Sequence, residues 1–372
     1  MSKNKNLKEV AFVFFKLGCV AFGGPAAHIA MMEDEIVTKR RWMSRQYFLD
    51  LIGVTNLIPG PNSTEMTMHC GHERAGKLGL IIAGFCFILP ATMVTLLFAY
   101  FYIHYGMLPA VAPFLIGIKP AVLAIIASAI FKLGQKAIKN YQLLLLGVLV
   151  VIASFLGINE IIVLLGSGIL GAIVFNSIEK KQKIFSISPI LLLSFGLSKL
   201  SHLKLFLIFL KVGAVLYGSG YVLFAYLDSE LVDKGWLTRV ELIDAIAVGQ
   251  FTPGPVLSTA TFIGYQLGGF CGALLATLGI FLPSFIFVLI LNPLIPKLQK
   301  SIVFRHFLNS VNVAAVGVML VVLYRMAVST VVDWRMFVIF TAGLVVVFFY
   351  KKISVIWIVL GGAFIGYILQ NF

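Results

Sequence analysis

The tripeptide Pro-Gly-Pro occurs twice in this chain, as Pro59-Gly60-Pro61 and as Pro253-Gly254-Pro255, and each copy interrupts an apolar stretch. Because proline lacks a backbone N–H and clashes with the preceding turn, a helix cannot continue through such a sequence. Inside a bilayer, the freed backbone groups are tolerated only where protein or a water-filled cavity satisfies them. Matching helix breaks in two halves of a chain therefore predict a transporter's binding site.

The residues that follow each break predict an anion site. A proline followed by hydroxyl or amide side chains is typical of a helix start. A helix that begins within the membrane directs free N–H groups and the positive end of its dipole into the cavity, where an oxyanion can bind. The alternative role of these side chains is to cap their own helices. The predicted substrate contacts are both Pro-Gly-Pro loops and Asn62, Ser63, Thr64, Ser258 and Thr259.

Three lysines interrupt apolar runs and are the predicted source of positive charge. Lys16 and Lys211 occupy the same position in two related halves of the chain, and Lys119 precedes Pro120 in an otherwise uncharged run. A lysine near the middle of a membrane helix costs about 2.5–3.5 kcal/mol on insertion, so it usually binds a ligand or an acidic partner. Extension of Lys16 and Lys211 to the membrane surface is the alternative. For Lys119, substrate contact and structural pairing both stay open.

Three carboxylates are candidates for proton coupling: Asp50 and Asp244, which are repeat partners, and Glu65, which follows the first break. The two aspartates could instead pair with Lys16 and Lys211. A His-x-x-His spacing after Glu65 resembles metal-ligand spacing, but no cysteine–histidine–carboxylate set accompanies it, so no metal site is predicted. We also expect no cofactor and no enzyme activity, because neither a nucleotide-binding motif nor a nucleophile–base set is found.

The composition identifies an integral membrane protein. Of the 372 residues, 60% are hydrophobic and 12% are charged, and the apolar residues form runs near the roughly 20 residues needed to cross a bilayer. The net charge of +14 would suit a nucleic-acid partner. However, the basic residues lie in short clusters between apolar runs, which is typical of cytoplasmic loops. The expected partners are therefore the lipid bilayer and an oxyanion, without nucleic acid, and a homodimer is left open.

The chain contains two copies of one unit, residues 16–175 and 211–370. Equivalent residues lie 193 to 195 positions apart, and they include Lys16-Leu17-Gly18 with Lys211-Val212-Gly213, Glu35 with Glu230, and Trp42 with Trp236. Five lysines follow the first copy, as is typical of a cytoplasmic loop. The predicted domains are an N-terminal transporter repeat (1–178), a basic cytoplasmic linker (179–204) and a C-terminal transporter repeat (205–372).

The predicted fold is an all-α integral membrane protein made of two tandem repeats. Each repeat is expected to have five transmembrane helices and a broken re-entrant hairpin, which in the first copy is Tyr47–Ile58 with Asn62–His72. An odd number of crossings inverts the second repeat, whereas a broken element that crosses makes the repeats parallel. The inverted arrangement places 19 basic residues inside and 7 outside, against 15 and 11 for the parallel one. The positive-inside rule therefore favours inversion.

The order of the motifs in both halves resembles that of the chromate ion transporter family. The motifs are Phe22–Ile29, Arg41-Trp42, Pro59–Glu65 and Phe87–Pro90, then Gln250–Pro255 and Gly279–Pro283. The resemblance covers nearly the whole chain and implies the two-domain form, a bacterial plasma-membrane carrier that exports chromate and confers resistance. It adds the motif residues Gly23, Gly24 and Pro25 as candidate substrate contacts. Gly220 and Val256 replace Pro25 and Asn62 in the second half, which suggests that the first half contributes more substrate contacts.

We therefore expect a secondary active transporter of a small divalent oxyanion, and specifically chromate efflux driven by the proton motive force. Chromate and sulfate share charge and shape, so sulfate or a related oxyanion is the near alternative. A membrane-embedded enzyme and a passive channel are the alternatives from other classes. One broken-helix site in each repeat suits alternating access better than a channel. The expected location is the bacterial plasma membrane, with several crossings.

Overall fold

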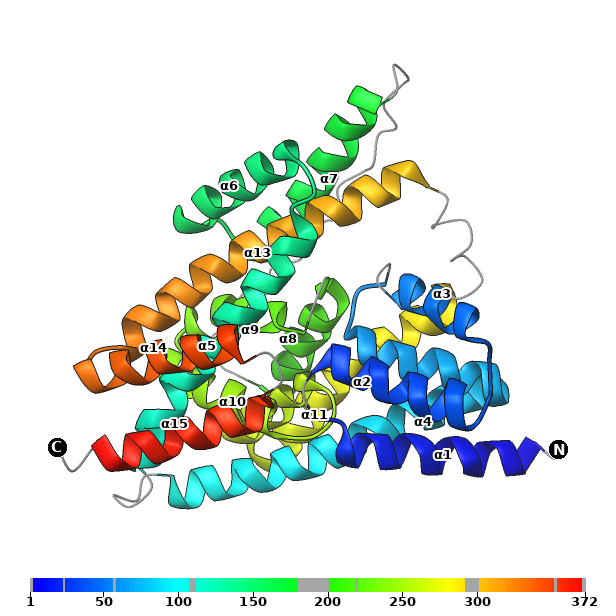
Figure 1. The fold of residues 1–372 in the computed structure, drawn as a ribbon, viewed down its shortest axis with the longest axis horizontal. Coiled ribbons are helices and arrows are strands. Elements are labelled where there is room, and N and C mark those ends of the chain that lie inside the picture. Colours follow the sequence, from blue (N-terminus) through cyan, green and yellow to red (C-terminus); the bar gives the residue numbers. More distant parts are fainter. Residues whose placement is uncertain are drawn as a thin grey trace.

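The computed structural model describes residues 3–22, 24–55, 58–106, 112–179, 201–217, 220–291, 301–350 and 353–369. Every regular element in these ranges is helical, which confirms the predicted all-helical fold (Figure 1). The first repeat contains α1 (Lys3–Val20), α2 (Pro25–Met32), the π-helix η1 (Glu33–Lys39), α3 (Arg45–Thr55), α4 (Asn62–Tyr105), α5 (Ala112–Ala137), α6 (Tyr141–Phe155) and α7 (Glu160–Glu179). The second repeat contains α8 (His202–Val215), α9 (Val222–Leu227), the π-helix η2 (Asp228–Val232), α10 (Arg239–Phe251), the 3₁₀ turn η3 (Val256–Ser258), α11 (Thr259–Leu291), α13 (Ile302–Thr330), α14 (Trp334–Phe349) and α15 (Val355–Leu369).

The helices of the two repeats pack in equivalent pairs. The pair α1 and α4 of the first repeat is equivalent to the pair α8 and α11 of the second. Likewise, α6 and α7 pack against α13 of the opposite repeat, and α14 and α15 pack against α5. The equivalent helices α4 and α11 contact each other, and so do α5 and α13. In Figure 1, α13 crosses the upper half of the molecule beside α6 and α7, and α1 lies along α4 at the lower right. The two repeats therefore pack in the same way around the contact between α4 and α11 and the contact between α5 and α13.

The equivalent long helices α4 and α11 each begin with a half-helix that folds back on the rest. Helical geometry is interrupted at Ala75-Gly76 in α4 and at Gly268-Gly269 in α11. Gly71 and Gly79 are eight residues apart and would be separated by ~12 Å in a straight helix. In the structure, a Cβ built on Gly71 would touch the backbone of Gly79, so the chain folds back between them. Residues 62–74 are therefore a separate arm that follows the first Pro-Gly-Pro loop, as the sequence predicts, and the membrane-length helix comes after it.

The interior is filled by aliphatic side chains where equivalent helices meet. Val122 of α5 and Val313 of α13 are buried in one cluster. A Cβ on Gly117 would collide with the backbone of Gly362, so α5 and α15 approach closely at that point. Small residues permit such close packing between membrane helices.

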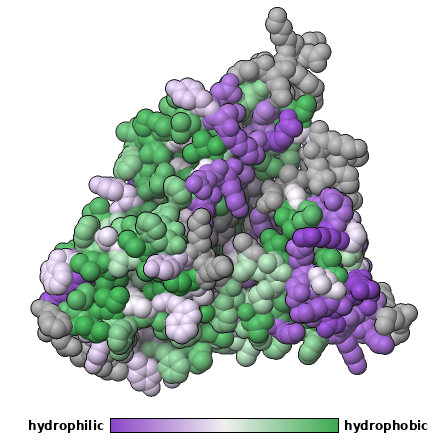
Figure 2. Space-filling view, in the orientation of Figure 1, coloured by the Kyte–Doolittle hydropathy of each residue, from purple (hydrophilic) through white to green (hydrophobic). Residues whose placement is uncertain are grey.

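In the described ranges, four helical segments are long and apolar enough to cross a membrane. They are Asn62–Tyr105, Pro113–Ala137, Val256–Ile290 and Ile302–Thr330, and shorter apolar helices are Tyr141–Phe155, Glu160–Phe175, Trp334–Phe349 and Val355–Leu369. Figure 2 shows an extensive apolar surface, with one group of hydrophilic residues at the right over α1 to α3 and a second group in the upper middle of the view. The number of crossings, the inversion of the second repeat and the domain boundaries stay predictions. Most of the predicted linker, residues 180–200, lies outside the described ranges.

Candidate functional site

The two Pro-Gly-Pro loops bind the opposite repeat through their backbones. The N–H of Gly60 donates to the carbonyl oxygen of Leu216 at 2.6 Å, and the N–H of Gly254 donates to that of Ala21 at 2.8 Å. Ala21 and Leu216 are repeat partners, and they directly follow α1 and α8 at the two glycine-rich breaks. Four helix breaks, two from each repeat, therefore meet in two equivalent pairs.

Both central glycines are required by conformation and by space. Their φ angles are 143° for Gly60 and 87° for Gly254, which residues with a side chain rarely adopt. A Cβ on Gly60 would collide with the carboxylate of Glu65 and the hydroxyl of Ser284. A Cβ on Gly254 would lie 3.0 Å from that of Ala91. The loops therefore pack tightly against the half-helix and the long helices beside them.

The first half-helix begins where the sequence predicts, with Pro61 directly before Asn62. Ser63 and Thr64 are buried, and the Thr64 hydroxyl has no hydrogen-bond partner in the described chain. Asn62 is half-buried and lines a small cavity. The first turn of α4 therefore places an unsatisfied hydroxyl and a cavity-lining amide directly after the loop.

The second half-helix begins differently, with the short turn η3. The hydroxyl oxygens of Thr252 and Ser258 lie 3.4 Å apart, and the Thr259 hydroxyl donates to the carbonyl oxygen of Val256 at 2.8 Å. Both predicted contact hydroxyls are thus engaged within their own segment. These contacts are with a neighbouring hydroxyl and a carbonyl oxygen, so they are not helix caps. The first repeat therefore offers more groups to a ligand.

Glu65 is a completely buried carboxylate one turn into α4. It lies against Gly60, and Ser284 of α11 borders the same point. No basic side chain in the described ranges forms an ion pair with it. The equivalent residues of Glu65 and Ser284 in the opposite repeat are Thr259 and Ala91. This carboxylate therefore breaks the symmetry of the duplicated centre.

Lys16 and Lys211 form equivalent ion pairs. The Nζ of Lys16 lies 3.5 Å from the carboxylate of Glu35, and the Nζ of Lys211 lies 2.6 Å from that of Glu230. The acids are 8% and 4% exposed, whereas the lysines are 52% and 37% exposed. Both acids lie in the π-helices η1 and η2, which return past the preceding helix after the glycine-rich break. The lysines therefore neutralise buried acids from the more exposed side.

The two predicted proton-coupling aspartates do not contact those lysines, so the pairing considered from the sequence is wrong. Asp50 is exposed and accepts a hydrogen bond from Gln46 at 3.0 Å. Asp244 is buried, accepts a hydrogen bond from Tyr102 at 2.7 Å and lies 3.3 Å from the Nζ of Lys119. The sequence left substrate contact and structural pairing open for Lys119, and its contact with Asp244 is the structural pairing.

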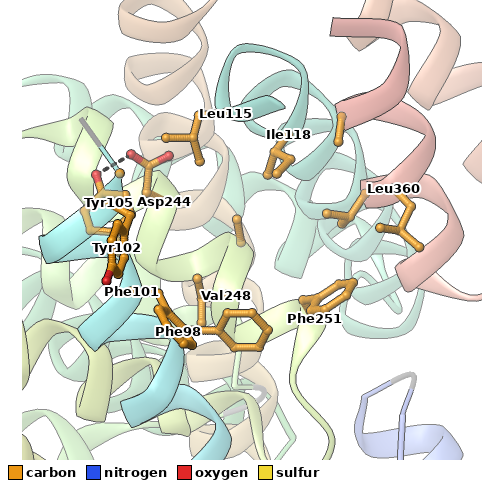
Figure 3. A pocket seen from close by; sticks show the side chains of 14 residues that line it. Phe98, Phe101, Tyr102, Tyr105, Leu115, Ile118, Asp244, Val248, Phe251 and Leu360 are labelled. Carbon is orange, nitrogen blue, oxygen red and sulfur yellow. Dashed lines mark hydrogen bonds between the residues drawn. The ribbon is translucent and has the colours of Figure 1, made fainter. Parts of the chain in front are cut away.

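An apolar cavity of about 560 Å³ lies between α4, α5, α10 and α15 (Figure 3). Aromatic and aliphatic side chains line it, and Asp244, bonded to Tyr102 at its edge, is the one charged residue in that described lining. An oxyanion would lose its hydration there, beside the carboxylate of Asp244, and would meet only tyrosine hydroxyls as side-chain donors in that described lining. The apolar cavity therefore does not fit the oxyanion site.

The remaining predicted contacts lie at the first glycine-rich break. Pro25 is the first residue of α2 and Gly24 precedes it, while Gly23 lies outside the described residues. A Cβ on Gly24 would be 3.8 Å from the hydroxyl of Tyr221, which follows the equivalent break in the second repeat. The sequence reasoning missed Tyr221 and Ser284 as neighbours of the breaks, although Tyr221 directly follows the second glycine-rich run.

The helix breaks that meet across two repeats, the duplicated ion pairs and the membrane-length helices around them define a helical membrane transporter built by duplication. The chain belongs to the chromate transporter family, whose family model matches residues 8–172 and again residues 203–367. The family predicted from the motifs is therefore confirmed, and this is a family of transporters rather than enzymes.

Several curated proteins are similar over most of the chain. A probable chromate transport protein of Synechococcus elongatus is 31% identical over 84% of this chain and 82% of its own length. A chromate transport protein of Pseudomonas aeruginosa is 28% identical, with 96% and 91% covered. An uncharacterised transporter of Methanocaldococcus jannaschii is 30% identical, with 98% and 95% covered. No solved structure matches the chain significantly.

Proposed function

We propose that this protein is a secondary active transporter that exports chromate across the bacterial plasma membrane. The observation that carries the proposal is the pair of hydrogen bonds, from Gly60 to Leu216 and from Gly254 to Ala21, that joins the helix breaks of opposite repeats. In alternating access, one repeat moves against the other around a fixed site, so contacts between broken elements can open and close a path. The relatives named as chromate transport proteins support chromate as the ion.

The substrate binds at the start of α4 in this proposal. Asn62, Ser63 and Thr64 lie in the first turn after the loop, where the positive end of the helix dipole favours an anion. Lys16 and Lys211 hold the arms of their own repeats together through ion pairs with Glu35 and Glu230, two acids that Arg40 and Lys234 also contact. Sulfate shares the charge and shape of chromate and is expected to compete.

Glu65 is the proton-binding residue in this proposal. Asp50 is exposed and Asp244 has a lysine partner, which leaves Glu65 as the buried acid beside the loop. A buried carboxylate without a cationic partner is costly when ionised, and a negative Glu65 would repel a dianion bound at Asn62. Proton uptake by Glu65 therefore favours oxyanion binding. A proton that leaves with the dianion makes the net exported charge −1, and the inside-negative membrane potential favours its export by about 2.3 kcal/mol per 100 mV.

Chromate uptake into everted membrane vesicles tests this function. Vesicles from expressing cells are expected to accumulate chromate when respiration is energised, and a protonophore and excess sulfate are each expected to reduce the accumulation. Vesicles without the protein are the control. Sulfate accumulation without chromate accumulation would contradict the substrate, and transport of neither ion would contradict the function.

A further inference from the structure

A second cavity, of about 170 Å³, lies at the start of α4 where α5 and α13 pack together. Its polar lining consists of Asn62 of α4, Lys136 in the last turn of α5, Lys139 just after α5, and Asn309 and Asn312 of α13. No acidic residue belongs to the described lining. This cavity is therefore positively charged and rich in amide groups, in contrast to the larger apolar cavity.

The two lysines of this cavity have no acidic partner in the part of the chain that the structure describes, whereas Lys16, Lys119 and Lys211 each have one. The Nζ of Lys139 donates to the side-chain oxygen of Asn309 at 2.8 Å, which holds this ammonium group at the cavity. Both lysines are exposed, so the cavity reaches the surface of the molecule. Two positive charges are thus left without compensation at its mouth.

The amide of Asn312 in α13 also needs an explanation, because Asn309 already accepts a hydrogen bond from Lys139. Asn309 and Asn312 are half-buried and three residues apart, so they share one face of a helix whose residues Val311 and Val313 are buried in the core. Amide groups are costly inside an apolar helix bundle unless they bind a polar partner. Asn312 also occupies the position that Lys119 has in the first repeat. This helix position is therefore polar in both halves.

We propose that this cavity is the entry site of the transporter, where a divalent tetrahedral oxyanion binds between Lys136, Lys139, Asn312 and Asn62 before it passes the first Pro-Gly-Pro loop. The inference rests on the proposed function and names the residues of its first binding step. Two ammonium groups match the charge of a dianion, and charge-assisted hydrogen bonds to its oxygens are strong. The basic end of α5 is predicted to be cytoplasmic, which is the side from which export begins.

The phosphate of an anionic lipid headgroup shares this chemistry. We assign the cavity to the transported ion because Asn62 directly follows Pro61, so an ion bound there touches the start of the half-helix. The two sources differ in what displaces them. A free oxyanion is displaced by sulfate, and a headgroup is displaced by other anionic lipid.

Equilibrium dialysis of the purified protein against labelled chromate, and separately sulfate, tests the entry site. The double variant Lys136→Gln/Lys139→Gln is expected to bind each ion about tenfold more weakly or worse, since charged hydrogen bonds are lost. Lys136→Arg/Lys139→Arg keeps the charge and is expected to retain most of the binding. Lys132→Gln is the matched control, because Lys132 is an exposed lysine one turn earlier on α5 that does not line the cavity. Size-exclusion profiles confirm that each variant is folded.

The outcomes separate this inference from the proposed function. Wild-type binding that the double variant retains in full would overturn the entry site and leave the proposed function standing. Absence of chromate and sulfate binding to the wild type would overturn both. Wild-type binding that persists in phosphatidylcholine nanodiscs but is lost in phosphatidylglycerol nanodiscs would assign the cavity to a lipid phosphate, and this would also overturn the entry site.

Discussion

The backbone N–H of Gly60 lies 2.6 Å from the carbonyl oxygen of Leu216 in the opposite repeat, and Gly254 and Ala21 repeat this hydrogen bond. Each Pro-Gly-Pro loop is therefore held by the end of a helix from the other half. Because helices pack around both contacts, a loop cannot shift without disturbing the other repeat. The packing of the loops is thus expected to control transport as well as folding.

Substitution of Gly60 by alanine tests this coupling. The added Cβ would displace the carboxylate of Glu65, and the backbone would be strained by about 1–3 kcal/mol. We expect chromate uptake by everted vesicles to fall by about tenfold or more, which corresponds to strain of this size. Gly235→Ala is the matched control, because Gly235 also has a positive φ, 73°, but no atom crowds its position. Equal loss in both variants would indicate backbone strain alone.

Replacement of Glu65 by glutamine tests the proton-binding role. Glutamine keeps the size of the side chain but cannot ionise, so it imitates the protonated acid. We expect the variant to bind chromate and to exchange it across the membrane, with an exchange rate that no longer depends on pH, because the side chain at this buried position cannot ionise. Ser284→Ala changes the other side chain beside Gly60 but leaves the acid in place, so its exchange rate is expected to keep the pH dependence of the wild type. A wild-type pH profile in Glu65→Gln would exclude Glu65 from coupling.

The lysines at the first position of each repeat are expected to matter for stability more than for transport. Glu35 keeps Arg40 at 3.0 Å when Lys16 is replaced, so Lys16→Met is expected to lower the free energy of unfolding by no more than about 1 kcal/mol. Chromate flux is expected to stay within about twofold of the wild type, since a loss of that size is below 1 kcal/mol. Denaturation in detergent and vesicle uptake measure the two quantities. A folded variant with no flux would restore Lys16 to the substrate contacts.

The ion pair between Lys119 and Asp244 is expected to be a structural link between α5 and α10. Asp244→Asn leaves the lysine without its buried partner and is expected to cost about 3 kcal/mol of stability. The double variant Lys119→Met/Asp244→Leu removes both charges and is expected to recover much of that loss. Tyr102→Phe deletes one hydrogen bond to Asp244 and is expected to cost about 1 kcal/mol. Thermal unfolding measures the stability of these three variants. A double variant less stable than both single variants would contradict a structural role for the ion pair.

The sequence predicted the elements whose local signals are strong. Two Pro-Gly-Pro breaks remove backbone donors, and α4 begins at Asn62 directly after the first of them. A half-helix over Asn62–His72 and a membrane-length apolar helix after it were also expected, and the structure interrupts α4 at Ala75-Gly76, close to that boundary. The repeat could be recognised because its landmarks, such as Lys16 with Lys211, recur at a nearly constant spacing.

The partners of charged residues could not be predicted from local signals. Glu35 was visible as the repeat partner of Glu230, but its contact with Lys16 depends on how η1 returns past α1. The pairing of Lys119 with Asp244 joins different repeats, and so do the contacts of both loops. Such contacts depend on how whole helices pack, which residue spacing does not specify.

Counterflow of labelled chromate into proteoliposomes tests the central claim most directly, because the purified protein is then the only protein present. Vesicles loaded with unlabelled chromate are expected to accumulate labelled chromate transiently, and external sulfate is expected to compete. Asn62→Ala is expected to abolish the accumulation, while Gly235→Ala retains it. Accumulation of neither chromate nor sulfate above that of protein-free liposomes would contradict an oxyanion transporter with its site at the start of α4.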